Sequence, residues 1–322
     1  MSLRRLAVAG GVMAAGAAVY QRLGEANDLR RFPAPGRLVD IGDRRIHLVQ
    51  HGEGHPAVVI ETGTRALATS WRAVVDAVGA FTTVVAYDRA GYGWSDGGRW
   101  PRTGERIAAE LRAALTAAGI PGPYVLVGHS SGGLYVRTFA ARYPDVVSGV
   151  VLVDASHEST FERPTVAEMR TVLSMTTASR SVSRAKRMLA GRNDIEGALR
   201  LRSSFRWALL GESLALHRTA RELAAASPPR SMPTAVVTAG SGDREWLELQ
   251  RDLAAQSAHS THVIADGSGH FVHLDRPEVV VDAIRHVVDV ARRPGISRSE
   301  AGGGDATAAS AWAESSPLTG PA

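Results

Sequence analysis

The feature that most constrains this fold is an alternation of short apolar runs, rich in β-branched residues, with longer helical patterns. The runs are apolar at successive positions, which is typical of strands buried on both faces of a parallel sheet. A shorter pair of runs, joined around Gly42-Asp43, precedes them and predicts an antiparallel hairpin. Together they predict an α/β fold with a mostly parallel eight-stranded sheet flanked by helices. The expected strands are 37–40, 45–50, 57–63, 82–88, 124–130, 149–155, 234–240 and 261–267, and the expected helices between or after them are 69–78, 106–118, 131–143, 244–256 and 277–291.

One connection is too long to fit this alternation of strands and helices. Residues 156–233 contain a helical pattern and no strand pattern. Because a structureless loop of that length is improbable inside a compact domain, we expect an inserted helical cap. The cap divides the core into residues 36–155 and 234–292. Its Phe205, Trp207 and several leucines either line an apolar pocket or hold the cap together.

The two ends of the chain differ from the core. Arg4 and Arg5 precede an uncharged run from Leu6 to Tyr20, which as a helix spans about 22 Å, less than the roughly 30 Å of a bilayer core. We expect residues 1–35 to hold a membrane anchor that extends over residues 6–23. A cleaved secretory signal and a soluble extension remain open alternatives. Residues 293–322, rich in Gly, Ala, Ser and Pro, predict a disordered tail.

Composition removes several classes of function. The chain of 322 residues has a net charge of +5, and its arginines are interleaved with acidic residues rather than gathered in one stripe, so no nucleic-acid partner is expected. It has no cysteine, which excludes a thiolate nucleophile and a cysteine-ligated metal.

The most specific motif is Gly128-His129-Ser130-Ser131-Gly132, which fits G-x-S-x-G. It follows the apolar run YVLV and opens a predicted helix. A serine on such a sharp strand-to-helix turn has a strained backbone, and the flanking small residues remove side chains that would collide there. The hydroxyl then stands clear of the sheet, and we expect Ser130 to be a nucleophile.

With this motif the chain resembles the α/β-hydrolase superfamily, over roughly residues 38–290. Two other segments carry the resemblance. Residues 87–95, YDRAGYGWS, look like the family's turn after the fourth strand, and Gly269-His270-Phe271 looks like its histidine loop. The resemblance implies a Ser-acid-His triad in that chain order.

A serine hydroxyl needs a general base, and the base needs an orienting acid. Among eleven histidines, His270 is preferred because it follows the last strand in a Gly-rich loop. His273 is expected to serve in packing or a hydrogen bond. For the acid we prefer Asp243, shortly after the run 234–240, with Asp154 and Asp266 as alternatives.

The resemblance also implies an oxyanion hole made of two backbone amides. One is expected from Ser131, and the other from the loop after residues 57–63, where Thr64 aligns with the donor position and Arg65 is the alternative. We therefore expect a serine hydrolase that cleaves an apolar small-molecule ester or acyl substrate through an acyl-enzyme, without a cofactor or metal. Enzymes similar to proline iminopeptidases or to cofactor-free haloperoxidases and perhydrolases, and a non-catalytic scaffold of the same fold, are the alternatives.

Overall fold

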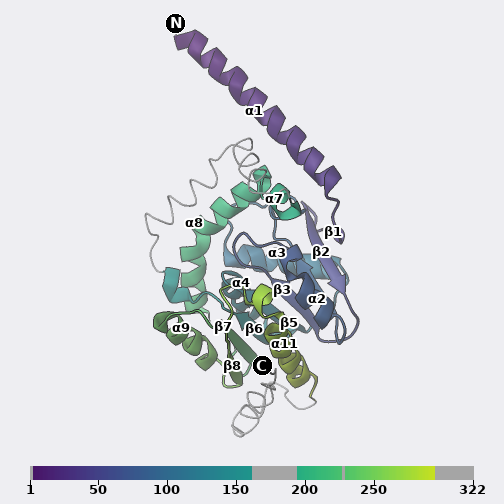
Figure 1. Ribbon diagram of the computed structural model, residues 1–322, viewed down its shortest axis with the longest axis vertical. Helices are drawn as coiled ribbons and strands as arrows, with labels where there is room; N and C mark the ends of the chain where they lie inside the picture. The colour runs from purple at the N-terminus through teal and green to yellow at the C-terminus, as the bar shows by residue number, and fades with distance from the viewer. Residues whose placement is uncertain (1–2, 162–193, 227–228, 294–322) are drawn as a thin grey trace, which may run out of the picture.

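The computed structural model describes residues 3–161, 194–226 and 229–293. Part of the expected cap (162–193) and the expected tail from residue 294 on lie outside the described residues. The described chain forms a sheet covered on both faces by helices, with one long helix projecting from this body (Figure 1).

An eight-stranded sheet forms the centre, as the sequence predicted. Its spatial order is β1-β2-β4-β3-β5-β6-β7-β8; β2 pairs antiparallel with β1 and with β4, and all other pairs are parallel. The carboxyl ends of the central strands therefore meet at one edge of the sheet. The strands are β1 (Arg37–Asp40), β2 (Arg45–His51), β3 (Ala57–Glu61), β4 (Val84–Tyr87), β5 (Tyr124–His129), β6 (Val147–Val153), β7 (Thr234–Ala239) and β8 (Ser260–Ala265).

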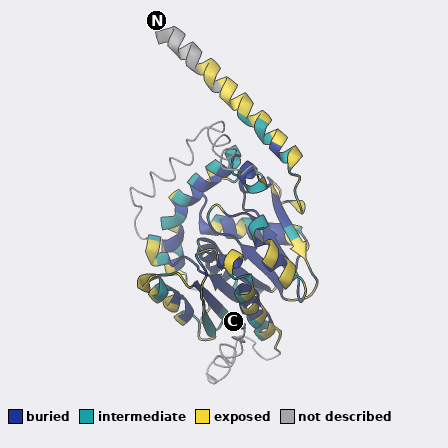
Figure 2. Cartoon of the chain, in the orientation of Figure 1, coloured by how far each residue is buried: buried dark blue, intermediate teal, exposed yellow. Residues whose placement is uncertain are grey.

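Helices cover both faces of this sheet, and alternate residues of each strand supply two separate cores. Val58 and Ile60 of β3 face one core, and Val59, between them, faces the other. Both faces are therefore apolar, which explains the unbroken apolar runs in the sequence; buried residues line the strands in Figure 2. The first core packs against α2 (Arg72–Val78) and α11 (Pro277–Arg292), and the second packs against α3 (Gly104–Ala117), α4 (Gly132–Arg142) and α9 (Arg244–Ala255).

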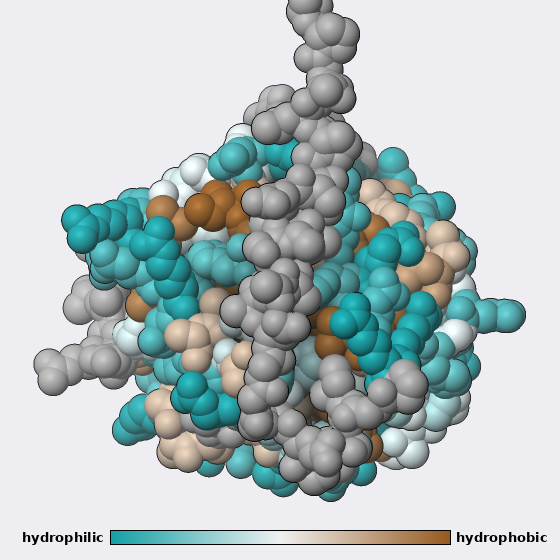
Figure 3. Space-filling view, turned by 90° about the horizontal axis from the view of Figure 1, so that it is seen from below, coloured by the Kyte–Doolittle hydropathy of each residue, from teal (hydrophilic) through white to brown (hydrophobic). Residues whose placement is uncertain are grey.

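Short helical turns complete the described core. A 3-10 turn, η1 (Ala68–Trp71), leads into α2, another, η2 (Pro144–Val146), leads into β6, and α10 (Val272–Asp275) precedes α11. On the face shown in Figure 3, most of the described surface is hydrophilic and the apolar residues form small separate patches.

The described part of the expected cap is helical. It contains η3 (Glu158–Phe161), α7 (Ile195–Leu199) and α8 (Ser203–Ala225) between β6 and β7. Phe205 and Leu209 of α8 pack with Tyr92 and Trp94 of the core, so Phe205 serves as a packing contact that holds α8 against the core. Trp207 lies on the outside of the cap, 62% exposed, beside Trp100.

The N-terminal segment is one continuous helix, α1 (Leu3–Arg31), which projects from the body over much of its length (Figure 1). Its C-terminal part rests on the cap, where Gln21 donates a hydrogen bond to the carbonyl of Leu201 (2.7 Å) and Glu25 accepts one from the backbone N–H of Ser203 (2.7 Å). The Glu25 carboxylate thus satisfies an open amide at the start of α8, where negative charge is favourable. Among the described helices, none has the length and apolarity that crossing a membrane requires.

Candidate active site

The strand-to-helix turn at Ser130 lies at the centre of the candidate site. β5 ends at His129, α4 begins at Gly132, and Ser130 between them has a φ of 52°, in the left-handed region that non-glycine residues rarely adopt. Such strain is typical of functional turns. The neighbouring glycines make the turn feasible, because a Cβ at Gly128 would lie 2.6 Å from the Val136 side chain and 2.7 Å from the Gly132 carbonyl.

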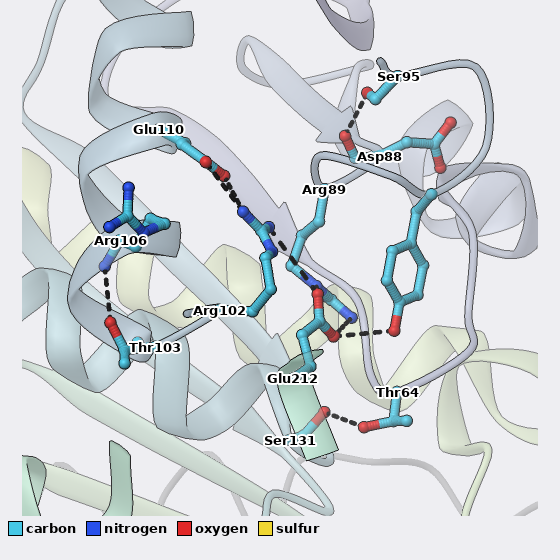
Figure 4. Close-up of polar contacts among 12 residues, drawn as sticks. Thr64, Asp88, Arg89, Ser95, Arg102, Thr103, Arg106, Glu110, Ser131 and Glu212 are labelled. Carbon is cyan, nitrogen blue, oxygen red and sulfur yellow. Dashed lines mark hydrogen bonds and ion pairs between the residues drawn. The ribbon is translucent and has the colours of Figure 1, made fainter. Parts of the chain in front are cut away.

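The loop after β3 passes directly beside this turn. A Cβ at Gly63 would lie 3.0 Å from the Cβ of Ser130 and 2.8 Å from Nδ1 of His129, so the loop's close approach requires glycine. The hydroxyls of Thr64 and Ser131 are 2.8 Å apart and share a hydrogen bond across this contact (Figure 4). The loop thereby stays against the N-terminus of α4.

Within the described chain, no hydrogen bond occupies the backbone amides of Ser131 and Thr64. Both amides lie on segments that flank Ser130, and Arg65, the alternative donor, has a φ of 68°. The structure therefore brings together the segments expected to form the oxyanion hole, and the role of each amide stays a prediction.

His270 pairs with Asp154. Nδ1 of His270 and Oδ2 of Asp154 are 2.6 Å apart, and Oδ1 accepts hydrogen bonds from Nε1 of Trp246 (2.7 Å) and the amide of Ala239 (2.9 Å). Burial by itself raises the pKa of Asp154, but the hydrogen bonds from His270, Ala239 and Trp246 outweigh it and leave the pKa below its ordinary value. The carboxylate is thus ionised and fixed behind the imidazole.

The expected pairing of His270 with Asp243 is wrong. Asp243 is exposed, and its Oδ1 accepts a hydrogen bond from the Trp246 amide at 2.8 Å, which makes it the N-cap of α9. Asp154 directly follows β6, and its φ of 42° turns the chain at the strand end. Asp266, the other alternative, is exposed beyond the end of β8.

Trp246 is a site residue that the sequence analysis missed. It lies on α9, and its indole N–H donates to Asp154 from an element far along the chain. A tryptophan three residues after Asp243 carries no sequence signal for this contact. Only the packing of α9 against β7 reveals it.

Two further histidines lie behind the catalytic candidates. His129 Nε2 is 2.9 Å from the His270 carbonyl, which ties the histidine loop to the serine turn. His273 is buried and stacks on Trp71 with ring centroids 4.2 Å apart. Within the described residues neither ring nitrogen of His273 has a hydrogen-bond partner. His273 therefore serves in packing, one of the two roles expected for it.

Burial makes these two histidines resist protonation. It lowers the pKa of His129 to about 4 and that of His273 to about 3. In the unfolded chain a histidine titrates near pH 6.5. Between that pH and about 4 the unfolded chain therefore binds more protons than the folded one, and the free energy of unfolding falls as the pH falls.

We predict that His273→Phe flattens this dependence. Phenylalanine keeps the stack on Trp71 and removes one titrating group, so the loss of unfolding free energy from pH 6.5 to pH 5 should be smaller by about 1.7 kcal/mol in total. Urea denaturation of the wild type and the variant at both pH values measures this difference. Equal slopes for the two proteins would contradict the prediction.

A cavity of about 460 Å³ opens beside the pair. Asp154 and His270 form part of its wall, and the remaining walls come mainly from the segment after β7 and from α9, including Trp246 and Leu249. Its size lies within the range of small-molecule sites. Its lining mixes apolar and polar side chains, because Ser241, Asp243 and Glu245 border it as well.

The turn 87–95, which resembles the family's turn after the fourth strand, also has a structural role. The Asp88 carboxylate accepts hydrogen bonds from the amide of Ala68 (3.0 Å) and is 2.8 Å from Nδ1 of His47. A Cβ at Gly93 would collide with this carboxylate, and Gly93 has a φ of 47°. Asp88 thus holds together the segments that follow β3 and β4.

Among curated proteins, the chain matches only part of the first relatives. It is 35% identical to a probable transporter, efuK, of Hormonema carpetanum over 140 residues, which cover 41% of this chain and 20% of the relative. A second relative, an uncharacterized protein of Schizosaccharomyces pombe, is 31% identical over 60% of this chain and 38% of its own length. The chain therefore spans about a fifth to two fifths of these proteins.

Other matches extend over most of both chains. A 2-(acetamidomethylene)succinate hydrolase of Mesorhizobium japonicum is 28% identical over 79% of this chain and 95% of the relative. The solved structure of the epoxide hydrolase CorEH superposes with a TM-score of 0.63 at 20% identity, covering 80% of this chain and 99% of that one. A thermophilic esterase from Thermogutta terrifontis gives 0.60 at 21% identity, with coverages of 78% and 95%.

A family model adds a match that is independent of any single relative. The model described as the alpha/beta hydrolase family matches residues 48–283, which begin in β2, end in α11 and include the serine turn, Asp154 and His270. The superposed structures share the fold at identities too low to indicate more. From the extent of the model match, we conclude that this chain belongs to the alpha/beta hydrolase family.

Proposed function

We propose that this chain is a serine hydrolase that cleaves a carboxylic ester or a related acyl substrate through a triad of Ser130, His270 and Asp154. The observation that carries the proposal is the bond between His270 and Asp154 beside a serine turn in strained backbone conformation. An orienting carboxylate on Nδ1 leaves Nε2 free to accept the serine proton. This revises the acid from Asp243 to Asp154 and keeps the order serine, acid, histidine along the chain.

The proposed reaction has two halves. Ser130 Oγ attacks the carbonyl carbon while its proton passes to Nε2 of His270, and the tetrahedral intermediate collapses as His270 returns the proton to the leaving alcohol. Water then attacks the acyl-enzyme, with its proton again taken by His270. The acid is released and the proton returns to Ser130. Asp154 remains ionised and stabilises the imidazolium.

The amides of Ser131 and Thr64 are the proposed donors to the oxyanion. They are fixed in direction before the substrate arrives, so their stabilisation of the tetrahedral intermediate costs no reorganisation. Support comes from their open amides and from the hydroxyl contact between the two residues. The Arg65 amide is the alternative second donor.

The similar proteins support hydrolytic chemistry of several kinds. They include an enol-lactonase from Burkholderia xenovorans and the esterase from Thermogutta terrifontis, both of which are named for acyl bonds that they cleave. Enzymes of the epoxide hydrolase type use a carboxylate nucleophile, whereas this chain has Ser130 at that position. We therefore favour acyl transfer over epoxide opening.

The proposed substrate is a small apolar ester or acyl compound, and the proposal requires no cofactor, metal or nucleic acid. Trp246 and Leu249 contribute apolar surface to the cavity beside His270. A series of p-nitrophenyl esters of rising acyl length tests the assignment. Hydrolysis by the wild type with a preference among chain lengths supports it, and the absence of turnover on the whole series contradicts it.

Two assays separate the alternatives within enzymes. Peracid formation from hydrogen peroxide and a carboxylic acid reports a perhydrolase, and release of p-nitroaniline from proline p-nitroanilide reports an iminopeptidase. Activity in either assay well above ester hydrolysis would replace the proposed substrate class while keeping the triad. A non-catalytic scaffold would show no activity in any of the three.

We also propose that residues 6–23 associate with a membrane. Val12, Met13 and Val19 of α1 are exposed, and α1 projects from the body over much of its length (Figure 1). We predict that the full chain co-sediments with liposomes containing anionic lipid, whereas a chain beginning at Val19 stays in the supernatant and keeps the contacts of Gln21 and Glu25 with the cap. Equal sedimentation of the two chains would contradict this placement.

A further inference from the structure

Arg89, immediately after Asp88 in the turn that follows β4, is buried and uses all five of its N–H donors. Nε donates to Oε1 of Glu212 at 3.0 Å, and Nη2 donates to Oε2 of Glu212 at 3.1 Å and to the carbonyl of Gly63 at 3.2 Å. Nη1 donates to Oε1 of Glu61 at 2.5 Å and to the carbonyl of Thr62 at 2.6 Å. One guanidinium therefore joins β3, the loop after it and the cap.

Two of these bonds act on the loop that carries the proposed oxyanion donor. The carbonyl of Gly63 and the N–H of Thr64 belong to one planar trans peptide group, so they point in opposite directions. Fixing the Gly63 carbonyl on Arg89 therefore fixes the direction of the Thr64 amide. The bond from Arg89 to the Thr62 carbonyl fixes the preceding peptide in the same way.

On its other side, Arg89 contacts the cap helix α8 through Glu212. Glu212 lies in the middle of α8, is buried, and also accepts a hydrogen bond from the hydroxyl of Tyr92 at 2.8 Å. Figure 4 shows the Glu212 carboxylate between the guanidiniums of Arg89 and Arg102, the latter at 4.0 Å. The position of α8 is thus coupled to Arg89, and through it to the loop.

The charges of this buried cluster compensate each other. Burial by itself lowers the pKa of Arg89, but the carboxylates of Glu212 and Glu61 outweigh it and raise the pKa well above its ordinary value. Arg89 is therefore always charged. A buried charge held by two carboxylates from different elements is costly to misplace, because any shift weakens at least one of these two charge pairs.

We propose that Arg89 is a positioning residue that orients the Thr64 amide toward the oxyanion and links that orientation to the seating of cap helix α8 through Glu212. This rests on the proposed acyl transfer at Ser130. Arg89 touches no reacting atom in this account. It acts through the peptide group between Gly63 and Thr64.

The first test is Arg89→Lys, with Arg137→Lys as the matched control. An ammonium has three donors and no planar fork, so lysine cannot hold both loop carbonyls and both carboxylates. Arg137 is also buried and pairs with Glu158 at 2.6 and 3.0 Å, on a segment away from the loop after β3. Arg137→Lys therefore removes a buried, two-bond contact between an arginine and a carboxylate, and it leaves the contacts of the loop after β3 unchanged.

We expect Arg89→Lys to lower kcat on a p-nitrophenyl ester by about 10²- to 10³-fold, the usual effect of losing one oxyanion donor, with KM changed less than tenfold. The affinity for a trifluoromethyl ketone, which forms a tetrahedral adduct with an oxyanion, should fall by a similar factor. If Arg89 had a purely structural role, the substitution would not weaken the binding of this analogue more than the binding of the substrate. Arg137→Lys should show neither effect.

Glu212→Gln provides a second variant of nearly unchanged shape, and it carries the test if Arg89→Lys fails to fold. It should lower kcat and analogue affinity together, and its effect should largely disappear in the Arg89→Lys background, since it acts through Arg89.

The outcomes separate this inference from the proposed function. Turnover by the wild type with Arg89→Lys and Glu212→Gln indistinguishable from Arg137→Lys would overturn the positioning role and leave the hydrolase assignment intact. Wild-type protein with no ester turnover and no labelling of Ser130 by a fluorophosphonate would overturn both.

Discussion

Ser130→Ala should abolish ester turnover, with a loss of about 10⁶-fold, and should leave the thermal unfolding temperature unchanged or higher. Removal of a triad nucleophile typically costs that much, because the residual catalysis comes only from oxyanion binding and substrate positioning. The hydroxyl of Ser130 makes no hydrogen bond to a described residue, so the fold does not depend on it. Steady-state kinetics on the best p-nitrophenyl ester and a thermal melt measure the two effects.

A serine-to-alanine change elsewhere controls for the substitution itself. Ser148 is half-buried on β6 and donates only to the carbonyl of Tyr124, so Ser148→Ala should keep wild-type turnover. Substantial turnover retained by Ser130→Ala would contradict the assignment of the nucleophile.

Asp154→Asn should lower kcat by about 10⁴-fold. The amide cannot stabilise the imidazolium, and its NH₂ group favours the wrong tautomer of His270, which is the origin of a loss of that size in a serine triad. Kinetics at neutral pH, with KM determined in parallel, measure it. The size of the fall in kcat identifies the acid, because aspartate and asparagine have nearly the same shape.

Asp243→Asn is the matched comparison. Asparagine is as good an N-cap as aspartate, so this change should keep both the start of α9 and the activity within a few-fold of wild type. A severe loss in Asp243→Asn together with a mild one in Asp154→Asn would reverse the two roles, and the structure of the loop after β7 would then have to change in the active protein.

The fold was predictable because its local patterns agree. The valine-rich runs at 57–63 and 149–155 became strands with both faces buried, since alternate residues of one strand enter opposite cores. Ser130 could be identified as a candidate because strand, tight turn and helix adjoin it in sequence. His270 was likewise marked by its position after the last strand.

The acid could not be chosen from the sequence alone. Asp154 and Asp243 both follow strands that end at the same edge of the sheet, and nothing in the spacing tells which carboxylate faces the histidine loop. Two structural features distinguish Asp154 from Asp243. The backbone turns at Asp154, and the indole N–H of Trp246 donates a hydrogen bond to the Asp154 carboxylate. Asp243, four residues beyond the end of β7, is instead bound by the helix that it caps.

Arg89 and Glu212 were also beyond the reach of sequence analysis. Arginine and glutamate are frequent throughout this chain, and these two are 123 residues apart. Their pairing depends on how α8 packs over the segment after β4. Phe205 shows the same limit, because an aromatic residue in a cap can line a pocket or anchor the cap, and here it packs with Tyr92.

The site and rate of reaction with a fluorophosphonate probe, followed by peptide mass spectrometry, test the proposed triad most directly. Such probes modify a serine only when a base activates it. We predict one adduct on Ser130 in the wild type, a rate at least a hundredfold lower in Asp154→Asn, and an unchanged rate in Asp243→Asn. An adduct on another residue, or equal labelling of Asp154→Asn and wild type, would contradict the proposed triad.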